Sequence, residues 1–235
     1  TMSVNGVKCA FKISNGYIII DKDGKTEDAG GIKKGGSLTG GGGSSVKPSD
    51  PGKTDEPVPD SEYYFTDVAD THWAKNEIEY LYKNGIINGK SEHIFDPDSS
   101  VTRAEFVALV VRSLGGNEEK YASSFEDVFE NAWYADYVQT ALRLGLISED
   151  KLFRPNDNIT REEVAKILLN TAELKEKADI PEEYELSFGD AAEISDWAKE
   201  YVRGCAYLKM FVGDENGCFN PKNSLTRAET AMVVF

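Results

Sequence analysis

The chain has 235 residues and a formal net charge of −15, with 26 Lys and Arg against 41 Asp and Glu. This acidic balance argues against a broad basic face that binds nucleic acid or an anionic membrane. No run reaches the roughly 18 apolar residues that a membrane-spanning helix needs. The three Cys and two His show no spacing typical of a zinc site or a disulfide framework. We therefore expect no metal, no cofactor and no segment inserted into a membrane.

The first 61 residues predict two segments of different character. Residues 1–28 contain apolar runs on either side of Asn15-Gly16, a strong signal for a β-hairpin. A lone hairpin is marginal in water, so we interpret these residues as the end of an upstream β domain. Residues 29–61 contain Gly40-Gly41-Gly42-Gly43 and then prolines among acidic residues, a composition typical of a linker.

From residue 62 onward the chain repeats itself three times, over residues 62–116, 117–180 and 181–235. Each repeat has a Phe-x-Asp opening, a Trp before an amphipathic helix, a turn, a Phe-x-Pro loop and a second helix that starts at Thr-Arg. Apart from the turn, these features begin at Phe65, Trp73, Phe95 and Thr102; at Phe125, Trp133, Phe153 and Thr160; and at Phe188, Trp197, Phe219 and Thr226. The third copy stops within its last helix, so the sequence is interpreted as a fragment of a longer protein.

Two short amphipathic helices cannot bury both of their apolar faces alone, so repeats of this kind stabilise one another. We therefore predict a mainly α fold in which the three repeats close on each other around a pseudo-threefold axis. In this arrangement, clefts form between neighbouring repeats.

The second helix of each repeat begins with a capping box. In Thr102-Arg103-Ala104-Glu105, the Thr side chain can accept the N–H of Glu105, and the Glu can reach back to the Thr N–H. The capping box does not explain the Arg, which recurs as Arg161 and Arg227 at a helix end where the dipole disfavours a cation. Two explanations are open: a buried carboxylate partner inside the fold, or an external anion bound at a helix start with free N–H groups.

These features together resemble the S-layer homology family over residues 62–235. The resemblance implies a mostly helical, three-pronged bundle that is not an enzyme. It implies an extracellular location at the bacterial cell wall and non-covalent anchoring through a secondary cell-wall polysaccharide, often one that carries pyruvate ketals. Other surface-layer proteins are a further expected partner.

The resemblance also implies which residues bind the glycan. In the family, an Arg, an Asp, an aromatic side chain and a turn Gly line grooves between adjacent prongs. Carried over to this chain, they are Asp67, Trp73, Gly89 and Arg103; Asp127, Trp133 and Arg161; and Asp190, Trp197, Gly213 and Arg227. Each type also has a purely structural explanation: the tryptophans as core residues, and the aspartates as partners of nearby backbone N–H groups or of the arginines.

Two turns depart from the pattern. Glu149 stands in the second repeat where Gly89 and Gly213 stand in the others, and a carboxylate there would repel an anionic sugar. We therefore expect Arg161, in the same repeat as Glu149, to contribute less to binding than the other two arginines. In the third repeat, Lys209 replaces a Gly at the start of the turn.

Two other functions are compatible with the sequence. The repeats could be a protein–protein scaffold of a surface layer, or the anchor of an upstream extracellular enzyme that this chain does not contain. A glycosidase site within the chain is disfavoured, because its carboxylates fall on repeated caps and turns. Cys205 falls on an apolar helix face, as a buried thiol would, while a Cys205–Cys218 disulfide stays open.

Overall fold

A computed structural model gives the fold of the chain. It describes the strands within the first 22 residues and then residues 65–115, 119–122, 125–171 and 179–235. The predicted linker, residues 29–61, lies outside the described residues. So does the predicted turn at Asn15-Gly16, and the hairpin as a whole therefore stays a prediction.

The N-terminal strands form one antiparallel sheet in the order β1-β2-β3. The strands are β1 (Met2–Val4), β2 (Val7–Ser14) and β3 (Tyr17–Lys22). In the β2–β3 pair, Ser14 lies opposite Tyr17 and Cys9 opposite Lys22.

The rest of the described chain is helical, as predicted. The first helices of the repeats are α1 (Lys75–Lys83), α3 (Ala135–Arg143) and α6 (Lys199–Tyr207), and α6 follows the short 3-10 helices η1 (Ala191–Glu193) and η2 (Asp196–Ala198). The second helices are α2 (Arg103–Ser113), α4 (Arg161–Leu169) and α7 (Arg227–Val234).

The predicted capping interactions start the second helices. In α2 the Thr102 hydroxyl accepts the Glu105 N–H at 3.2 Å, and the Glu105 carboxylate accepts the Thr102 N–H at 2.8 Å. The same pair of bonds starts α7. In α4 the Glu163 carboxylate accepts the Thr160 N–H at 3.0 Å.

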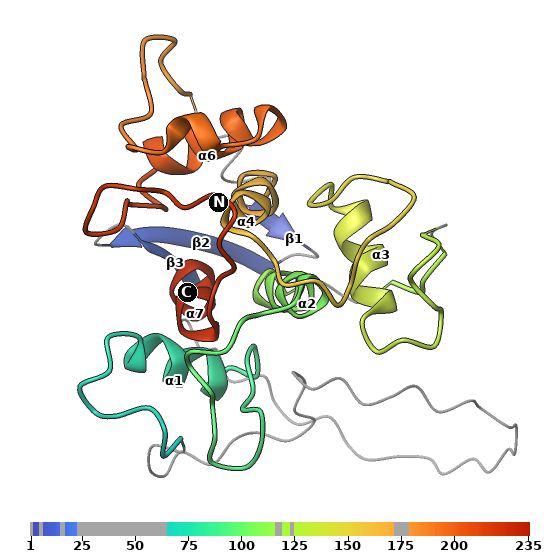
Figure 1. The fold of residues 1–235 in the computed structure, drawn as a ribbon. Helices are drawn as coiled ribbons and strands as arrows, with labels where there is room; N and C mark the ends of the chain where they lie inside the picture. The colour runs from blue at the N-terminus through green and yellow to red at the C-terminus, as the bar shows by residue number, and fades with distance from the viewer. Residues whose placement is uncertain are drawn as a thin grey trace, which may run out of the picture.

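Each second helix packs against the first helix of the next repeat. Figure 1 shows α2, α4 and α7 near the centre, with α1, α3 and α6 around them. The pairs in contact are α2 with α3, α4 with α6, and α7 with α1. The α7–α1 pair includes an edge-to-face contact between Tyr80 and Phe235, with ring centroids 4.9 Å apart. The last helix of the chain therefore covers the first, so the repeats stabilise one another, as expected.

Three buried residues join the repeats in a closed ring of backbone hydrogen bonds. The N–H of Val101 donates to Leu225 at 3.1 Å, that of Leu225 to Ile159 at 3.3 Å, and that of Ile159 back to Val101 at 2.9 Å. Each of these residues directly precedes the capping Thr of a second helix. Because the third bond returns to the first residue, the ring holds the starts of α2, α4 and α7 together.

The two cysteines of the third repeat are free thiols, so no Cys205–Cys218 disulfide forms. Cys205 is buried in α6, where its Sγ lies 3.4 Å from the carbonyl of Ala165. Burial raises the pKa of the Cys205 thiol, because a thiolate would be poorly solvated there. The thiol is therefore a packing residue that joins α6 to α4.

Candidate functional site

The arginine at the start of each second helix reaches into the next repeat. Its Nε–H donates to the carbonyl of the Phe in the Phe-x-Pro loop of that repeat, and its guanidinium lies over the same Phe ring. These bonds run from Arg103 to Phe153 at 2.9 Å, from Arg161 to Phe219 at 2.7 Å and from Arg227 to Phe95 at 2.8 Å. The corresponding distances to the ring centroid are 5.2, 5.2 and 4.5 Å. Each arginine therefore ties two repeats together.

Two of the arginines also meet a carboxylate of the next repeat. Arg103 lies 2.9 Å from Glu163, and Arg161 lies 3.7 Å from Glu229. Arg227 instead donates from Nη2 to a second carbonyl, that of Asn88, at 2.5 Å. Burial lowers the pKa of all three guanidinium groups, and nearby carboxylates partly offset this effect. Of the two explanations for an Arg at a helix start, a carboxylate partner inside the fold therefore holds for Arg103 and Arg161.

The N–H groups at these helix starts already have acceptors. In α2 the Arg103 N–H donates to Asp157 at 2.9 Å and the Ala104 N–H to Pro155 at 3.1 Å, while the Glu105 N–H donates to Thr102. The equivalent first two N–H groups of α4 and α7 likewise donate to carbonyls of the following repeat in the ring. The second of the two open explanations, an external anion held by free N–H groups, therefore does not fit these helix starts, and an external anion would have to bind the guanidinium itself.

The aspartates of the Phe-x-Asp openings hold the Phe-x-Pro loops. Asp127 accepts the N–H of Phe153 at 2.8 Å and that of Arg154 at 2.6 Å. Arg154 has φ of 61°, a left-handed conformation in which a side chain is strained, and the carboxylate stabilises this turn. Asp67 and Asp190 make the same pair of bonds in their repeats. The aspartates thus act on backbone N–H groups rather than as liners of a cleft.

Three clefts combine the arginine of one repeat, the turn of the next and the tryptophan of the third. Groove 1 is lined by Arg103, residues 146–150 and 152–154, Phe125, Glu163, Lys166, Ile167 and Trp197. Groove 2 is lined by Arg161, residues 210–214, Cys218, Asn220, Asn223, Ser224, Glu229, Met232, Val233 and Trp73. Groove 3 is lined by Arg227, residues 87–90, Glu105, Leu109, Arg112 and Trp133. The volumes are about 330, 340 and 80 Å³, so grooves 1 and 2 are roomy and groove 3 is narrow.

Two of the three tryptophans that line these clefts are exposed. Trp73 is 58% exposed and Trp197 is 49% exposed, which rules out the core explanation for both. Trp133 is half-buried and packs edge-on against Tyr134. In groove 1 the Lys166 ammonium lies 5.9 Å from the Trp197 ring centroid. Grooves 1 and 2 therefore each offer an exposed indole to a ligand.

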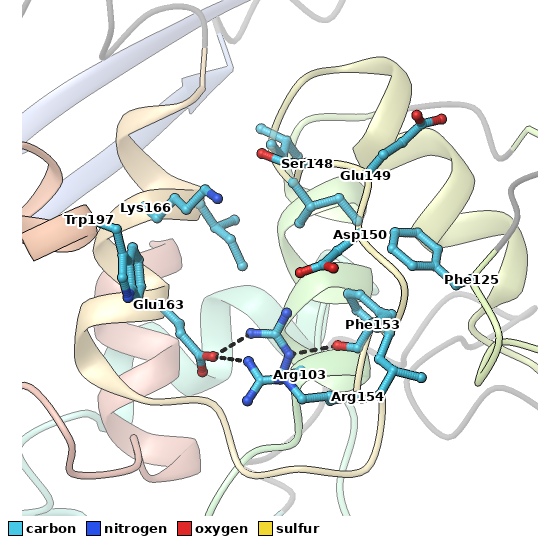
Figure 2. A pocket seen from close by; sticks show the side chains of 14 residues that line it. Arg103, Phe125, Ser148, Glu149, Asp150, Phe153, Arg154, Glu163, Lys166 and Trp197 are labelled. Atoms are coloured by element: carbon cyan, nitrogen blue, oxygen red, sulfur yellow. Dashed lines mark hydrogen bonds and ion pairs between the residues drawn. The ribbon is translucent and has the colours of Figure 1, made fainter. Parts of the chain in front are cut away.

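In groove 1, several of the charged side chains that line the cleft lie close to Arg103. Arg103 and Arg154 both contact Glu163, at 2.9 and 2.5 Å, and Trp197 stands on the same side of the cleft as that carboxylate (Figure 2). Glu149 points away from Arg103, while Asp150 lies closer to the guanidinium (Figure 2). The turn carboxylate nearest to the Arg in groove 1 is therefore Asp150 and not Glu149.

The sequence-based pairing of arginines with turns is wrong. Arg161 was expected to share a cleft with Glu149 of its own repeat, but the residue that shares this cleft is Arg103. Arg161 faces Gly213, and Arg227 faces Gly89, each in the following repeat of the ring. Each second helix packs against the first helix of the next repeat in the ring, so its arginine meets the turn of that repeat.

The turn glycines are required by close packing. A Cβ on Gly89 would lie 2.6 Å from the carbonyl oxygens of Ser91 and Ile94, and a Cβ on Gly213 would lie 2.9 Å from the carbonyl carbon of Gly217. These distances are too short for a side chain, because the backbone atoms in the way cannot move aside as a flexible side chain could. Gly89 and Gly213 therefore shape the walls of grooves 3 and 2.

Lys209 occupies a left-handed position that glycine fills in the other repeats. Its φ is 58°, against 66° at Gly85 and 71° at Gly145. We expect Lys209→Gly to stabilise the fold by about 1 kcal/mol, because this conformation costs a side chain roughly that much. Urea unfolding would measure this gain in stability. Gly145→Lys makes the opposite exchange and should destabilise the fold by a similar amount. A loss of stability in Lys209→Gly would contradict the assignment of strain to this residue.

The contact between Arg103 and Glu163 predicts acid sensitivity. Burial alone would raise the pKa of Glu163, but the charges of Arg103 and Arg154 and the Thr160 N–H lower it below its ordinary value of 4.5. A lowered folded-state pKa gives stability that is present above pH 4.5 and is lost as the pH falls through the folded value.

We therefore expect Glu163→Gln to be less stable than the parent chain at pH 7, with the difference shrinking as the pH falls below about 4.5. Thermal unfolding from pH 7 to pH 3 would measure it. Glu149→Gln is the control, because that side chain points away from Arg103 (Figure 2). A difference that stays constant with pH would rule out the ionised contact as its source.

The fold and clefts define a class: a module of tandem helical repeats with clefts where the repeats meet. Residues 64–107, 124–165 and 187–231 match the family described as S-layer homology domain. The chain belongs to this family, as the resemblance of its motifs predicted.

Relatives of two kinds match the same region. The chain is 38% identical over 172 residues to an amylopullulanase of Thermoanaerobacterium thermosulfurigenes and to exoglucanase XynX of Acetivibrio thermocellus. It is 30% identical over 173 residues to S-layer protein EA1 of Bacillus anthracis. These matches cover 72–73% of this chain but only 9%, 16% and 19% of the three relatives.

Family and relatives make the repeats a cell-surface anchoring module rather than a catalytic domain. Among the described residues, no helix is long and apolar enough to cross a membrane. The same residues contain no cluster of His, Cys, Asp or Glu that could hold a metal ion.

Proposed function

We propose that residues 62–235 attach their protein to the bacterial envelope by binding a secondary cell-wall polysaccharide that carries pyruvate ketals. The binding sites are the grooves between the prongs of a three-pronged bundle with pseudo-threefold symmetry. The protein carried by the anchor is a surface-layer protein or an extracellular enzyme upstream of the repeats.

The observation that supports this proposal is the recurrence of one arrangement in three clefts, with an arginine, a turn and a tryptophan from three different repeats. An indole face is a good surface for the apolar face of a sugar ring. A guanidinium binds a carboxylate through two parallel hydrogen bonds, and a pyruvate ketal supplies such a carboxylate. The acidic surface does not prevent this contact, because charges beyond about 10 Å are screened at 0.1 M salt.

The site residues divide into two roles under this proposal. Arg103, Arg161 and the exposed Trp73 and Trp197 contact the glycan. The aspartates and glycines act by positioning, since the aspartates bind loop N–H groups and the glycines permit tight turns.

A pull-down with purified cell-wall sacculi tests the function. We expect the chain to bind intact sacculi and to lose binding to sacculi from which the secondary polymer has been stripped. The double variant Trp73→Ala and Trp197→Ala should bind at least about tenfold more weakly, because an aromatic contact contributes about 1 kcal/mol beyond its buried area. Equal binding to intact and stripped sacculi would rule out the polysaccharide as the ligand.

A further inference from the structure

The three grooves carry different charges at an equivalent position. The residue directly after the turn Gly, or after Glu149 in the second repeat, is Lys90 in groove 3, Asp150 in groove 1 and Asp214 in groove 2. A turn residue next to the arginine site is thus a cation in one groove and a carboxylate in two. The grooves repeat in geometry but not in electrostatics.

Groove 2 is the most acidic of the three. Arg161 faces Asp214 and Glu229, and both carboxylates act on its charge. By contrast, groove 1 has three cations, Arg103, Arg154 and Lys166, against three carboxylates, those of Glu149, Asp150 and Glu163, so its lining is neutral where that of groove 2 has one negative charge in excess. The carboxylates of groove 2 therefore already balance its arginine, and a ligand carboxylate would gain little there.

The second helices enlarge this difference. The residue five positions after the arginine is Lys166 in α4 and Met232 in α7, and these two side chains line grooves 1 and 2. The same wall of the cleft thus ends in an ammonium group in groove 1 and in a thioether in groove 2.

The exposed apolar side chains of groove 2 are more exposed than those of groove 1, where Leu152 is 46% and Trp197 49% exposed. Trp73 is 58% exposed and Val212 is 65% exposed, and both line this groove. The residues equivalent to Val212 are the polar Asn88 and Ser148 in the other grooves. Two exposed apolar side chains beside a cleft are suited to the apolar face of a sugar ring.

We infer that groove 2 binds an uncharged sugar residue of the polysaccharide, whereas groove 1 binds the pyruvylated residue. This inference rests on the proposed function and adds that one anchor recognises two chemically different sugars. Groove 1 selects by its cations Arg103, Arg154 and Lys166. Groove 2 selects by Trp73 and Val212, and by carboxylates that disfavour an acidic sugar.

The chain has three tryptophans, one for each groove, and this permits a direct test on the full chain. The indole N–H signals in a nitrogen–proton correlation spectrum, assigned with single Trp→Phe variants, report each groove separately. The probes are a pyruvylated fragment of secondary cell-wall polysaccharide and the same fragment after mild acid has removed the pyruvate.

We expect the Trp73 signal to shift with both fragments. The affinity of groove 2 for the fragment without pyruvate should be at least equal to its affinity for the pyruvylated fragment. The Trp197 signal should shift with the pyruvylated fragment and respond at least tenfold more weakly to the uncharged one. If Trp73 responds only to the pyruvylated fragment, the inference is wrong while the proposed function stands. If no indole signal responds to either fragment, the proposed function itself fails.

Two variants test the assignment of charge. Lys166→Met should reduce the preference of groove 1 for the pyruvylated fragment, and Val212→Lys, at an exposed position, should give groove 2 such a preference. Unshifted amide signals elsewhere in the spectrum control for folding. Unchanged preferences in both folded variants would overturn the electrostatic basis of the inference.

Discussion

Asp127→Ala should destabilise the fold by about 3 kcal/mol, because it removes two charge-assisted hydrogen bonds that are each worth at least about 1.5 kcal/mol. Asp127 is only half-buried, so the lower end of that range applies. The bonds go to the N–H groups of Phe153 and Arg154, and the second of these residues has a left-handed backbone. Without the carboxylate, the Phe-x-Pro loop of the second repeat loses the group that stabilises its turn.

The effect of this substitution should extend to the first repeat. The carbonyl of Phe153 is the acceptor for Arg103, so the loop that Asp127 holds also positions the arginine of groove 1. We therefore expect Asp127→Ala and Arg103→Ala to be non-additive in a double-mutant cycle, with a coupling free energy of about 1 kcal/mol.

Glu126→Ala is the matched control, because this neighbouring carboxylate is exposed and lies 3.4 Å from the ammonium of Lys151. It should change stability by less than about 0.5 kcal/mol. Urea unfolding of the single and double variants measures both quantities. Strict additivity would show that the loop and the arginine are independent.

The starts of the second helices could be predicted because their determinants are local. Thr102 and Glu105 lie three residues apart, and the capping bonds between them depend only on that spacing. The apolar stripe of α1 is likewise a matter of helical period, and Ile78 and Leu81 on this helix are buried. For the same reason, the sequence predicted a mainly helical fold and the need for neighbouring repeats.

The composition of each groove could not be predicted, because it depends on contacts between repeats. The sequence places Arg161 and Glu149 in one repeat, yet they line different grooves. Trp73 belongs to the first repeat but lies beside the arginine of the second and the turn of the third. Equivalent sequence positions therefore identify the arginine, the turn and the tryptophan that line the clefts, while the packing of helices on the next repeat decides which of them share one cleft.

The explanation that relied on free N–H groups at the helix starts does not fit the structure for the same reason. In an isolated helix the Arg103 N–H would have no partner. In the fold, the loop of the second repeat brings the carbonyl of Asp157 to within 2.9 Å of it. The sequence contains no local sign of this bond, which joins residues 54 positions apart.

The three arginines differ in how deeply they are held, and Arg227 is the most buried, with 7% of its surface exposed. Its guanidinium donates to the carbonyls of Phe95 and Asn88, which lie 132 and 139 residues earlier in the chain. These bonds connect the last helix to the first repeat. Removing the side chain leaves two carbonyls without this donor and opens the contact that closes the ring.

Arg227→Ala should therefore be the most destabilising of the three arginine substitutions, at about 3–5 kcal/mol, because each bond from a charged donor is worth about 1.5–3 kcal/mol. Arg227→Lys should recover little of this loss, because an ammonium group lacks the planar fork that reaches two carbonyls. Arg161→Ala is the matched control, since its Nε makes the equivalent bond to Phe219 at 2.7 Å and Arg161 does not join the last repeat to the first.

Hydrogen exchange can show where the stability is lost. Because α7 packs against α1, Arg227→Ala should reduce the amide protection of α1, some 150 residues away, more than that of α3. Arg161→Ala should instead affect α6, since α4 packs there. If Arg227→Ala leaves α1 as protected as in the parent chain, the bonds to Phe95 and Asn88 do not hold the ring closed, and the stability of the first repeat rests on its own helices.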